Sequence, residues 1–233
     1  MPLPLRAIPP SGPPDGGEWW AAIPAVRQVL TEGWDLSPIT VLVGDNGAGK
    51  STLVEAVAVA FGMGPEGGSI GSGYTTRPSE SGLRLSVRRD IGAGRSGFFL
   101  RAETMHAFYS FLEDNPGSGY EPAFHRMSHG ESFLSLIGDR MTRPGLYVLD
   151  EPESALSFDG CLALVAKVKD LEANDSQVLL STHSPVLAAI PDAAIWEVGE
   201  WGLRRCDWED LDLVRRWRGF LESPERFLRH VLD

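Results

Sequence analysis

Apolar residues fall into short, nearly continuous runs separated by longer segments in which apolar positions recur with the period of a helix. The runs at 39–43, 145–149 and 177–181 are typical of strands buried on both faces of a parallel sheet. Shorter runs predict strands at 195–198 and 203–206, and the other segments predict helices at 19–30, 51–61, 103–112, 131–140, 158–172, 210–220 and 224–231. The first of these helices is expected to be interrupted at Pro24. Helices that alternate with short strands indicate a single α/β domain over 1–233, with a mainly parallel central sheet covered on both faces.

Two segments depart from this alternation. Residues 83–90 alternate apolar and polar side chains, a glycine turn follows at 92–94, and 97–101 form a second apolar run. This order predicts an antiparallel β-hairpin over 83–101, and with it a small antiparallel β subdomain. Residues 1–17 are dense in proline and glycine, which predicts an extended arm.

Composition and charge narrow the classes of function. The chain has 32 acidic and 21 basic residues, and its formal net charge of −11 disfavours non-specific binding to nucleic acid. It has no apolar stretch of about 18 residues, no N-terminal secretory signal, and two cysteines without metal-ligand spacing. We therefore expect a cytoplasmic protein with no membrane partner.

One segment carries a specific chemical signal. Residues 44–51 read G-D-N-G-A-G-K-S and match the phosphate-binding pattern G-x-x-x-x-G-K-[ST], between a predicted strand and a predicted helix. The glycines let backbone amides approach phosphates closely, Lys50 supplies a positive charge, and Ser51 offers a hydroxyl to Mg²⁺. The residues expected to bind the nucleotide phosphates are Gly44, Asp45, Asn46, Gly47, Ala48, Gly49, Lys50, Ser51 and Thr52.

Two further predicted strands end in residues that suit phosphoryl transfer. Asp150 and Glu151 follow the strand at 145–149, and His183 follows the strand at 177–181. Because ligands bind at the carboxyl ends of parallel strands, we expect these side chains near the phosphate loop. Asp150 would hold Mg²⁺ together with Ser51, Glu151 would orient the attacking water, and His183 would contact the γ-phosphate. Lys50, Glu151 and His183 are the candidate catalytic residues, and ATP and Mg²⁺ are the expected cofactors.

The motifs in this order resemble those of the ABC-type (ATP-binding cassette) ATPases. Residues 44–51 resemble Walker A, 146–151 resemble Walker B with its catalytic glutamate, and His183 resembles the switch histidine. The segment 128–131 resembles the ABC signature and consists of Ser128, His129, Gly130 and Glu131. The segment 154–157 resembles the D-loop and consists of Ser154, Ala155, Leu156 and Ser157. The strings S-H-G-E-S-F, L-Y-V-L-D-E-P-E-S-A-L-S and S-T-H-S-P are similar to those of small stand-alone bacterial "AAA family" ATPases of the SMC/Rad50-like branch.

The resemblance implies a P-loop NTPase fold of the ABC type with a reduced helical lobe over 103–140. It also implies a head-to-tail homodimer around ATP, in which the signature of one copy completes the nucleotide site of the other. The glutamine that many cassettes place after the antiparallel strands is not evident, and Glu103 is the residue expected to take its metal-facing role. The segment between Glu103 and Ser128 is short compared with transporter cassettes, which argues against a transporter engine.

Three functions stay open at this point. The first is an ATPase that converts hydrolysis into opening and closing, and the second is a nucleotide-gated module that switches a protein partner with little turnover. The third is a DNA-repair type ATPase, for which the support is an arginine cluster interleaved with carboxylates: Arg204, Arg205, Arg215, Arg216 and Arg218. Four aromatic residues are open candidates for stacking on the base, namely Trp19, Trp20, Trp34 and Tyr74.

Overall fold

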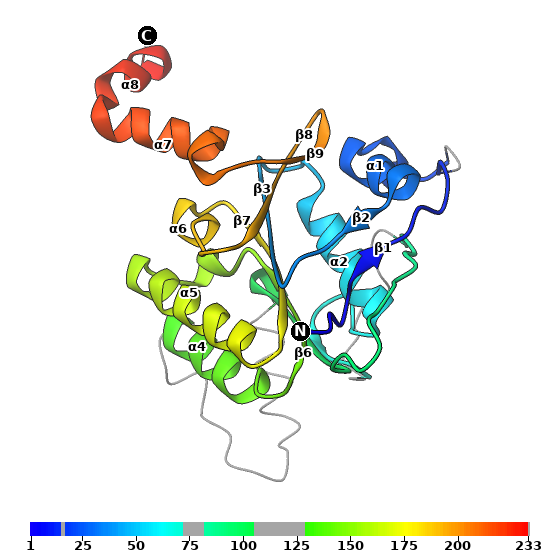
Figure 1. The fold of residues 1–233 in the computed structure, drawn as a ribbon. Helices are drawn as coiled ribbons and strands as arrows, with labels where there is room; N and C mark the ends of the chain where they lie inside the picture. The colour runs from blue at the N-terminus through cyan, green and yellow to red at the C-terminus, as the bar shows by residue number, and fades with distance from the viewer. Residues whose placement is uncertain (15–16, 72–81, 105–128, 233) are drawn as a thin grey trace.

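The structure, a computed structural model, describes residues 1–14, 17–71, 82–104 and 129–232. Its centre is a seven-stranded sheet in the order β4-β5-β6-β7-β3-β8-β9 (Figure 1). The strands are β3 (Ile39–Gly44), β4 (Gly68–Ser69), β5 (Ser96–Arg101), β6 (Gly145–Asp150), β7 (Gln177–Thr182), β8 (Ala194–Gly199) and β9 (Gly202–Arg205). The five strands from β5 to β8 run parallel, and β4 and β9 add antiparallel edges. The mainly parallel α/β sheet expected from the apolar runs is confirmed.

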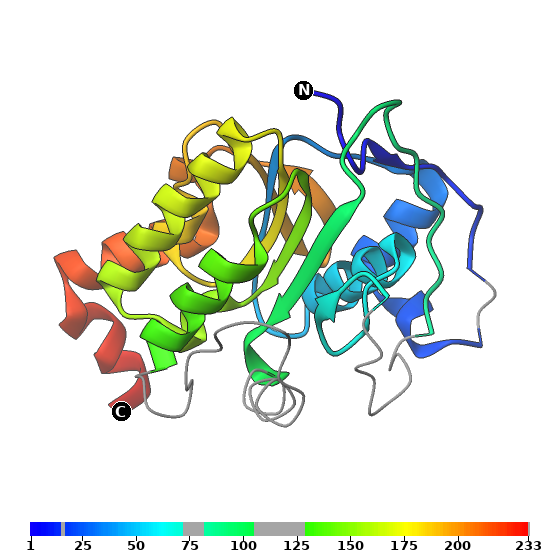
Figure 2. The same cartoon turned by 90° about the horizontal axis from the view of Figure 1, so that it is seen from below.

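Helices cover both faces of the sheet, as Figure 2 shows. One face carries α1 (Pro24–Glu32) and α2 (Lys50–Phe61), and the other carries α4 (His129–Arg140), α5 (Phe158–Ala173), α6 (Pro185–Ala188) and α7 (Asp212–Glu222). The chain continues into α8 (Pro224–Leu232), and the described residues also include the short 3₁₀ helices η1 (Trp19–Ala22), η2 (Ala102–Thr104), η4 (Pro152–Ala155) and η5 (Trp208–Asp210). Of the helices that the structure describes, none combines the length and apolarity that a membrane crossing requires.

The β-hairpin predicted over 83–101 is wrong in its pairing. β5 pairs antiparallel with β4 and parallel with β6, whereas the preceding segment makes only an isolated bridge between Arg88 and Ala7. The reason is burial: Phe98 and Phe99 on β5 are both buried, so this strand needs covered faces and a paired edge on each side. In residues 84–90 apolar side chains alternate with polar or charged ones, and this segment runs along the surface instead of pairing with β5.

Two of the predicted helices need comment. The helix predicted over 19–30 is interrupted at Pro24, as expected, and divides into η1 and α1, because Pro24 lacks an amide hydrogen and starts a new helix at its first position. Of the helix predicted over 103–112, Glu103 lies on η2 and residues 105–112 lie outside the described residues. The reduced lobe over 103–140 is therefore described at 103–104 and from α4 onward only.

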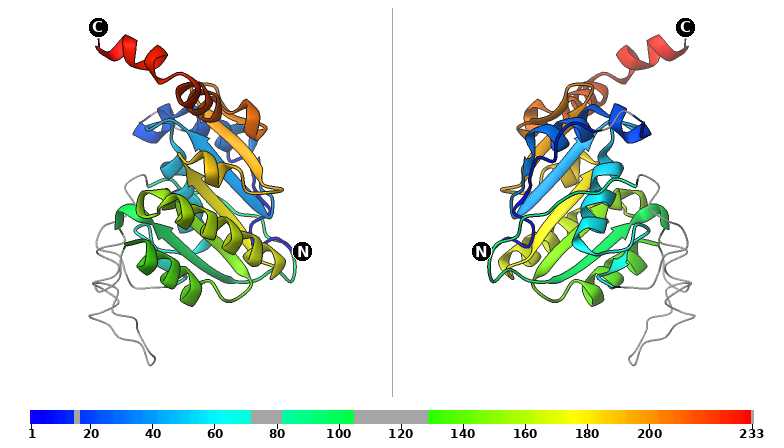
Figure 3. Two further views of the ribbon diagram at one scale, coloured as in Figure 1. Left: turned by 90° about the vertical axis from the view of Figure 1, so that its left-hand side faces the viewer. Right: turned by 90° about the vertical axis from the view of Figure 1, so that its right-hand side faces the viewer.

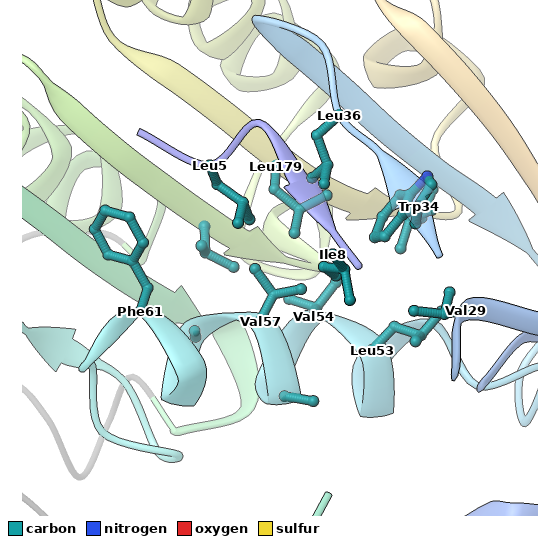
Figure 4. Packing of buried hydrophobic residues seen from close by; sticks show 14 of the residues in the cluster. Leu5, Ile8, Val29, Trp34, Leu36, Leu53, Val54, Val57, Phe61 and Leu179 are labelled. Atoms are coloured by element: carbon teal, nitrogen blue, oxygen red, sulfur yellow. The ribbon is translucent and has the colours of Figure 1, made fainter. Parts of the chain in front are cut away.

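The N-terminal arm is extended, as predicted, but part of it belongs to the core. Leu5 and Ile8 are buried against α2, and β1 (Ala7–Ile8) pairs with β2 (Trp34–Asp35) (Figure 4). The fully buried side chain of Gln177 fixes the arm to β7: its amide nitrogen donates to the Leu5 carbonyl at 2.7 Å, and its amide oxygen accepts from the Leu5 amide at 2.8 Å. The arm thus closes the apolar core between the sheet and the helices α1 and α2.

Replacing Gln177 with leucine should release the arm. The substitution leaves the buried amide and carbonyl of Leu5 without partners, which costs about 1–3 kcal/mol of unfolding free energy. Urea unfolding measures that loss, and limited proteolysis should cut the Gln177→Leu variant within residues 1–17 before it cuts the parent. A variant with parental stability and an equally protected arm would show that the arm is held by Leu5 and Ile8 alone.

Candidate functional site

The phosphate loop joins β3 to α2, and its glycines sit where a side chain does not fit. Gly47 and Gly49 have φ angles of 79° and 99°, in the left-handed region. A Cβ on Gly44 would lie 2.3 Å from the Val198 carbonyl oxygen, and a Cβ on Gly49 would lie 2.4 Å from a methyl carbon of Ile23. The loop therefore runs close to β8 on one side and to the start of α1 on the other. Its amides lead into the N-terminus of α2, which favours an anion.

Lys50 is the first residue of α2, and its side chain is only 2% exposed. The ammonium group donates to the carbonyls of Gly44 at 3.0 Å and Asp45 at 3.2 Å. It also lies 2.8 Å from Nε2 of His183 and 3.9 Å from the carboxylate of Glu151. Burial lowers the pKa of Lys50, and the nearby carboxylates, led by that of Glu151, oppose this effect. The three predicted catalytic side chains thus meet in one place.

Glu151 adopts a backbone conformation that non-glycine residues rarely take, with φ 49° and ψ 50°. Such a conformation costs about 1–3 kcal/mol and persists only where its surroundings hold it. Here the Glu151 amide donates to the Ser181 carbonyl at 3.1 Å, and its carboxylate lies 3.1 Å from Nε2 of His183. These contacts hold the strained backbone of Glu151, and with it a half-buried carboxylate, at the edge of the sheet next to the phosphate loop.

Asp150 is the centre of a row of polar side chains across three strands. The parallel register aligns Arg101 of β5, Asp150 of β6 and Ser181 of β7, so these side chains project from the same face. Ser51 donates to one oxygen of Asp150 at 3.2 Å and Ser181 donates to the same oxygen, while Arg101 donates to the other at 3.1 Å. Ser51 and Asp150, the predicted metal ligands, are thus brought together.

Arg101 is the functional residue that sequence analysis missed. Its guanidinium also bonds the carboxylate of Glu55 on α2 at 3.2 Å, and both Asp150 and Glu55 are 3% exposed. Burial disfavours the charged form of Arg101, but the carboxylates of Asp150 and Glu55 outweigh it and raise its pKa. Arg101 was missed because only the parallel register of β5 and β6 sets it opposite Asp150, and the sequence analysis had placed its strand in an antiparallel hairpin.

His183 comes directly after β7, at the same edge of the sheet as Asp150. Its backbone amide donates to the carboxylate of Glu153 on η4, a second residue that sequence analysis missed. This bond fixes the turn after β7 to the segment after β6. The histidine ring is thereby held between Lys50 and Glu151.

The oxygen atoms at this site fit Mg²⁺. A hydroxyl and a carboxylate from Ser51 and Asp150 are the hard donors that the ion prefers, and they already lie within 3.2 Å of each other. In the described ranges no three His, Cys, Asp or Glu side chains cluster as a metal site. Glu103 is exposed on η2, and its role as a metal ligand stays a prediction.

The signature and D-loop segments are described in part. Ser128 lies outside the described residues, and α4 begins at His129 and includes Gly130 and Glu131. On the D-loop segment, Ser154 donates to the Glu151 carbonyl at 2.9 Å, and Ser157 caps α5 by accepting from the Gly160 amide at 3.1 Å. Ala155 and Leu156 lie between them, partly buried. Their roles across a dimer stay predictions.

A cavity of about 570 Å³ runs beside the phosphate loop. Its walls come from the start of α1, the loop itself, His183, the turn between β8 and β9 with Trp201, and α7 with Arg216. Among the proposed stacking residues, Trp34 is buried in the core, Tyr74 lies outside the described residues, and neither Trp19 nor Trp20 lines the cavity. Trp201, which does line it, was missed because it lies about 150 residues from the phosphate loop.

A P-loop nucleotide-binding fold is defined by a strand, a glycine-bearing loop and a helix in succession. Here the helix starts at a lysine, and a nearby strand carries a carboxylate. A family model described as "AAA domain, putative AbiEii toxin, Type IV TA system" matches residues 39–132. The chain is 27% identical over 222 residues to an uncharacterized ABC transporter ATP-binding protein of Haemophilus influenzae, covering 83% of this chain and 82% of that protein. It is also 30% identical over 155 residues to the zinc import ATP-binding protein ZnuC of Vibrio vulnificus, covering 62% of this chain and 57% of the relative.

Two solved structures are similar at low identity. One is an inward-facing conformation of a putative metal-chelate type ABC transporter, with 18% identity, 76% of this chain and 75% of that chain covered, and a TM-score of 0.47. The other is the SMC head domain from Thermotoga maritima, with 14% identity, 75% and 93% covered, and a TM-score of 0.45. The family model, the curated relatives and the order of the motifs make the chain similar to ABC-type P-loop ATPases.

Proposed function

We propose that the chain binds ATP with Mg²⁺ and hydrolyses it. The observation that carries the proposal is the meeting of Lys50, Glu151 and His183 beside the phosphate loop, within 2.8 to 3.9 Å of one another. Phosphoryl transfer to water requires a positive charge on the phosphate and a carboxylate that orients the water. Lys50 and Glu151 supply these two groups, and His183 lies between them. The cavity that continues from the loop toward α7 would receive the nucleoside.

Each side chain has a distinct task in the proposed reaction. The loop amides and Lys50 bind the β- and γ-phosphates, and Ser51 and Asp150 hold the metal ion. The bound ion supplies positive charge that neutralises the phosphate oxygens. Glu151 orients the attacking water and accepts its proton, and His183 contacts the γ-phosphate. Arg101 keeps the Asp150 carboxylate oriented toward Ser51.

The proposal includes a head-to-tail homodimer that opens and closes with the nucleotide. The N-terminus of α4 at His129 supports it, because a helix start with the preceding Ser128 suits an anion. In this arrangement Ser128, His129, Gly130 and Glu131 of one copy would meet the ATP of the other. The proposal that no membrane partner takes part rests on the short segment between Glu103 and Ser128. Co-purification of the chain with membranes would overturn that part.

Phosphate release from Mg-ATP tests the activity. The purified chain should release phosphate steadily, and chelation of Mg²⁺ should stop the release. ATP binding without phosphate release would favour the nucleotide-gated module instead, and stimulation of release by duplex DNA that disappears at high salt would favour the DNA-linked alternative.

Binding of ATP should be linked to proton uptake at alkaline pH. Burial lowers the pKa of Lys50 below its usual 10.5, and the negative phosphates would raise it again. Affinity should therefore fall as pH rises through the lowered pKa, where neutral Lys50 must gain a proton on binding. Titration calorimetry in two buffers of different ionisation enthalpy measures this uptake. Binding enthalpies that agree between the two buffers over that range would contradict it.

A further inference from the structure

The C-terminal helices form a hairpin that stands away from the rest of the chain. α7 lies against the body through the buried side chains of Leu211 and Val214, whereas α8 projects outward (Figures 1 and 3). The two helices meet through Phe220 of α7 and Phe227 of α8, whose ring centroids are 5.9 Å apart, and Trp217 lies 6.5 Å from Phe220 within α7. The hairpin is therefore a defined element with its own small apolar contact.

One face of this hairpin is apolar and exposed. Leu221 is 72% exposed, Leu228 45%, and Val231 and Leu232 both 79%. Leu228, Val231 and Leu232 follow helical spacing along α8, and Leu221 lies one turn beyond Trp217 on α7, so each helix carries an exposed apolar row. The two rows together are the apolar strip, and exposed apolar side chains gathered in this way mark an interaction surface. We call these four residues with Trp217 and Phe227 the hairpin face.

The charge of the hairpin is opposite to that of the rest of the chain. Between Asp212 and Leu232 there are five arginines and three carboxylates, although the whole chain has a net charge of −11. Two of these arginines already pair with carboxylates of the body: Arg215 with Asp210, and Arg216 with Asp45 at 3.5 Å. In the part of the chain that the structure describes, Arg226 and Arg229 on α8 form no ion pair.

We propose that the hairpin face docks on the acidic body of a second copy of this chain. The partner chemistry that fits is an apolar patch with carboxylates around it, and a second copy supplies the carboxylates in excess.

This dimer requires no nucleotide, so its test is independent of the proposed ATPase. Sedimentation velocity of the full chain without nucleotide should give a dimer. The double variant Leu221→Glu and Leu228→Glu places charge in the apolar strip and should sediment as a monomer, with its dimer dissociation constant raised at least 100-fold. Both side chains are exposed, so the variant should keep the melting temperature of the parent.

The matched control is Ile91→Glu, which changes an isoleucine that is 100% exposed far from the hairpin, and it should stay dimeric. Charge reversal of Arg226 and Arg229 should also weaken the dimer. A parent chain that is monomeric at about 100 μM, or a double variant that dimerises as the parent does, would overturn the proposal. Co-flotation of a monomeric parent with phosphatidylserine vesicles would overturn it as well and would assign the face to lipid.

Discussion

The variant Glu151→Gln should bind ATP as the parent does and hydrolyse it about 10²- to 10⁴-fold more slowly. Glutamine keeps the size of the side chain and its contact with His183, but it cannot accept a proton from the attacking water. Because the nucleotide is bound but not consumed, the variant should also collect as the ATP-held dimer in gel filtration. Single-turnover phosphate release measures the rate, and light scattering measures the mass.

The matched control for this variant is Glu32→Gln, an exposed glutamate on α1 whose described partner is Gln28. It should turn over ATP at the parental rate. Undiminished hydrolysis by the Glu151→Gln variant would remove Glu151 from the reaction and assign the water to another residue. Since the hairpin face is proposed to dimerise without nucleotide, the ATP-held dimer should be assayed with the Leu221 and Leu228 substitutions present.

The variant Arg101→Met should lose about 3–5 kcal/mol of unfolding free energy. Arg101 pairs with both Asp150 and Glu55, and these carboxylates are 3% exposed. Removing the cation leaves two buried negative charges close together, which costs far more than the loss of a surface ion pair. Urea unfolding measures the loss. The Arg101→Lys variant should recover part of it, because an ammonium restores the charge but not the two-pronged geometry.

A surface ion pair supplies the comparison. Arg6 pairs with Asp90 at 3.5 Å and its side chain is 60% exposed, so Arg6→Met should cost at most about 1 kcal/mol. If Arg101→Met costs no more than Arg6→Met, then Arg101 does not hold Asp150 in place.

The nucleotide site was predictable because its parts are local in sequence. The phosphate loop follows a strand whose four apolar residues require burial, and Asp150 and His183 stand at the ends of two strands of the same kind. Parallel strands bring their carboxyl ends to one edge, so the meeting of Lys50, Glu151 and His183 followed from the pattern alone. The fold class followed from the same runs.

The residues that sequence analysis missed depend on register and on distant pairing. Arg101 and Ser181 flank Asp150 only because three strands align in one register, and Trp201 reaches the cavity through a turn between β8 and β9. The hairpin over 83–101 was mispredicted for a related reason. Alternation in 83–90 indicates one covered face, but it does not say which strand, if any, lies alongside.

The most direct test of the central claim, that residues 44–52 bind the phosphates of ATP, is the binding isotherm of Mg-ATP on the parent and on the Lys50→Ala variant. A charge-assisted contact of a buried lysine with phosphate contributes about 1.5–3 kcal/mol, so the variant should bind about 10- to 100-fold more weakly. Thermal melting of both proteins shows that the fold is kept. Saturable binding by the parent, and the weaker binding of the variant, is the predicted result; equal affinities, or no binding of Mg-ATP by the parent, would contradict the account.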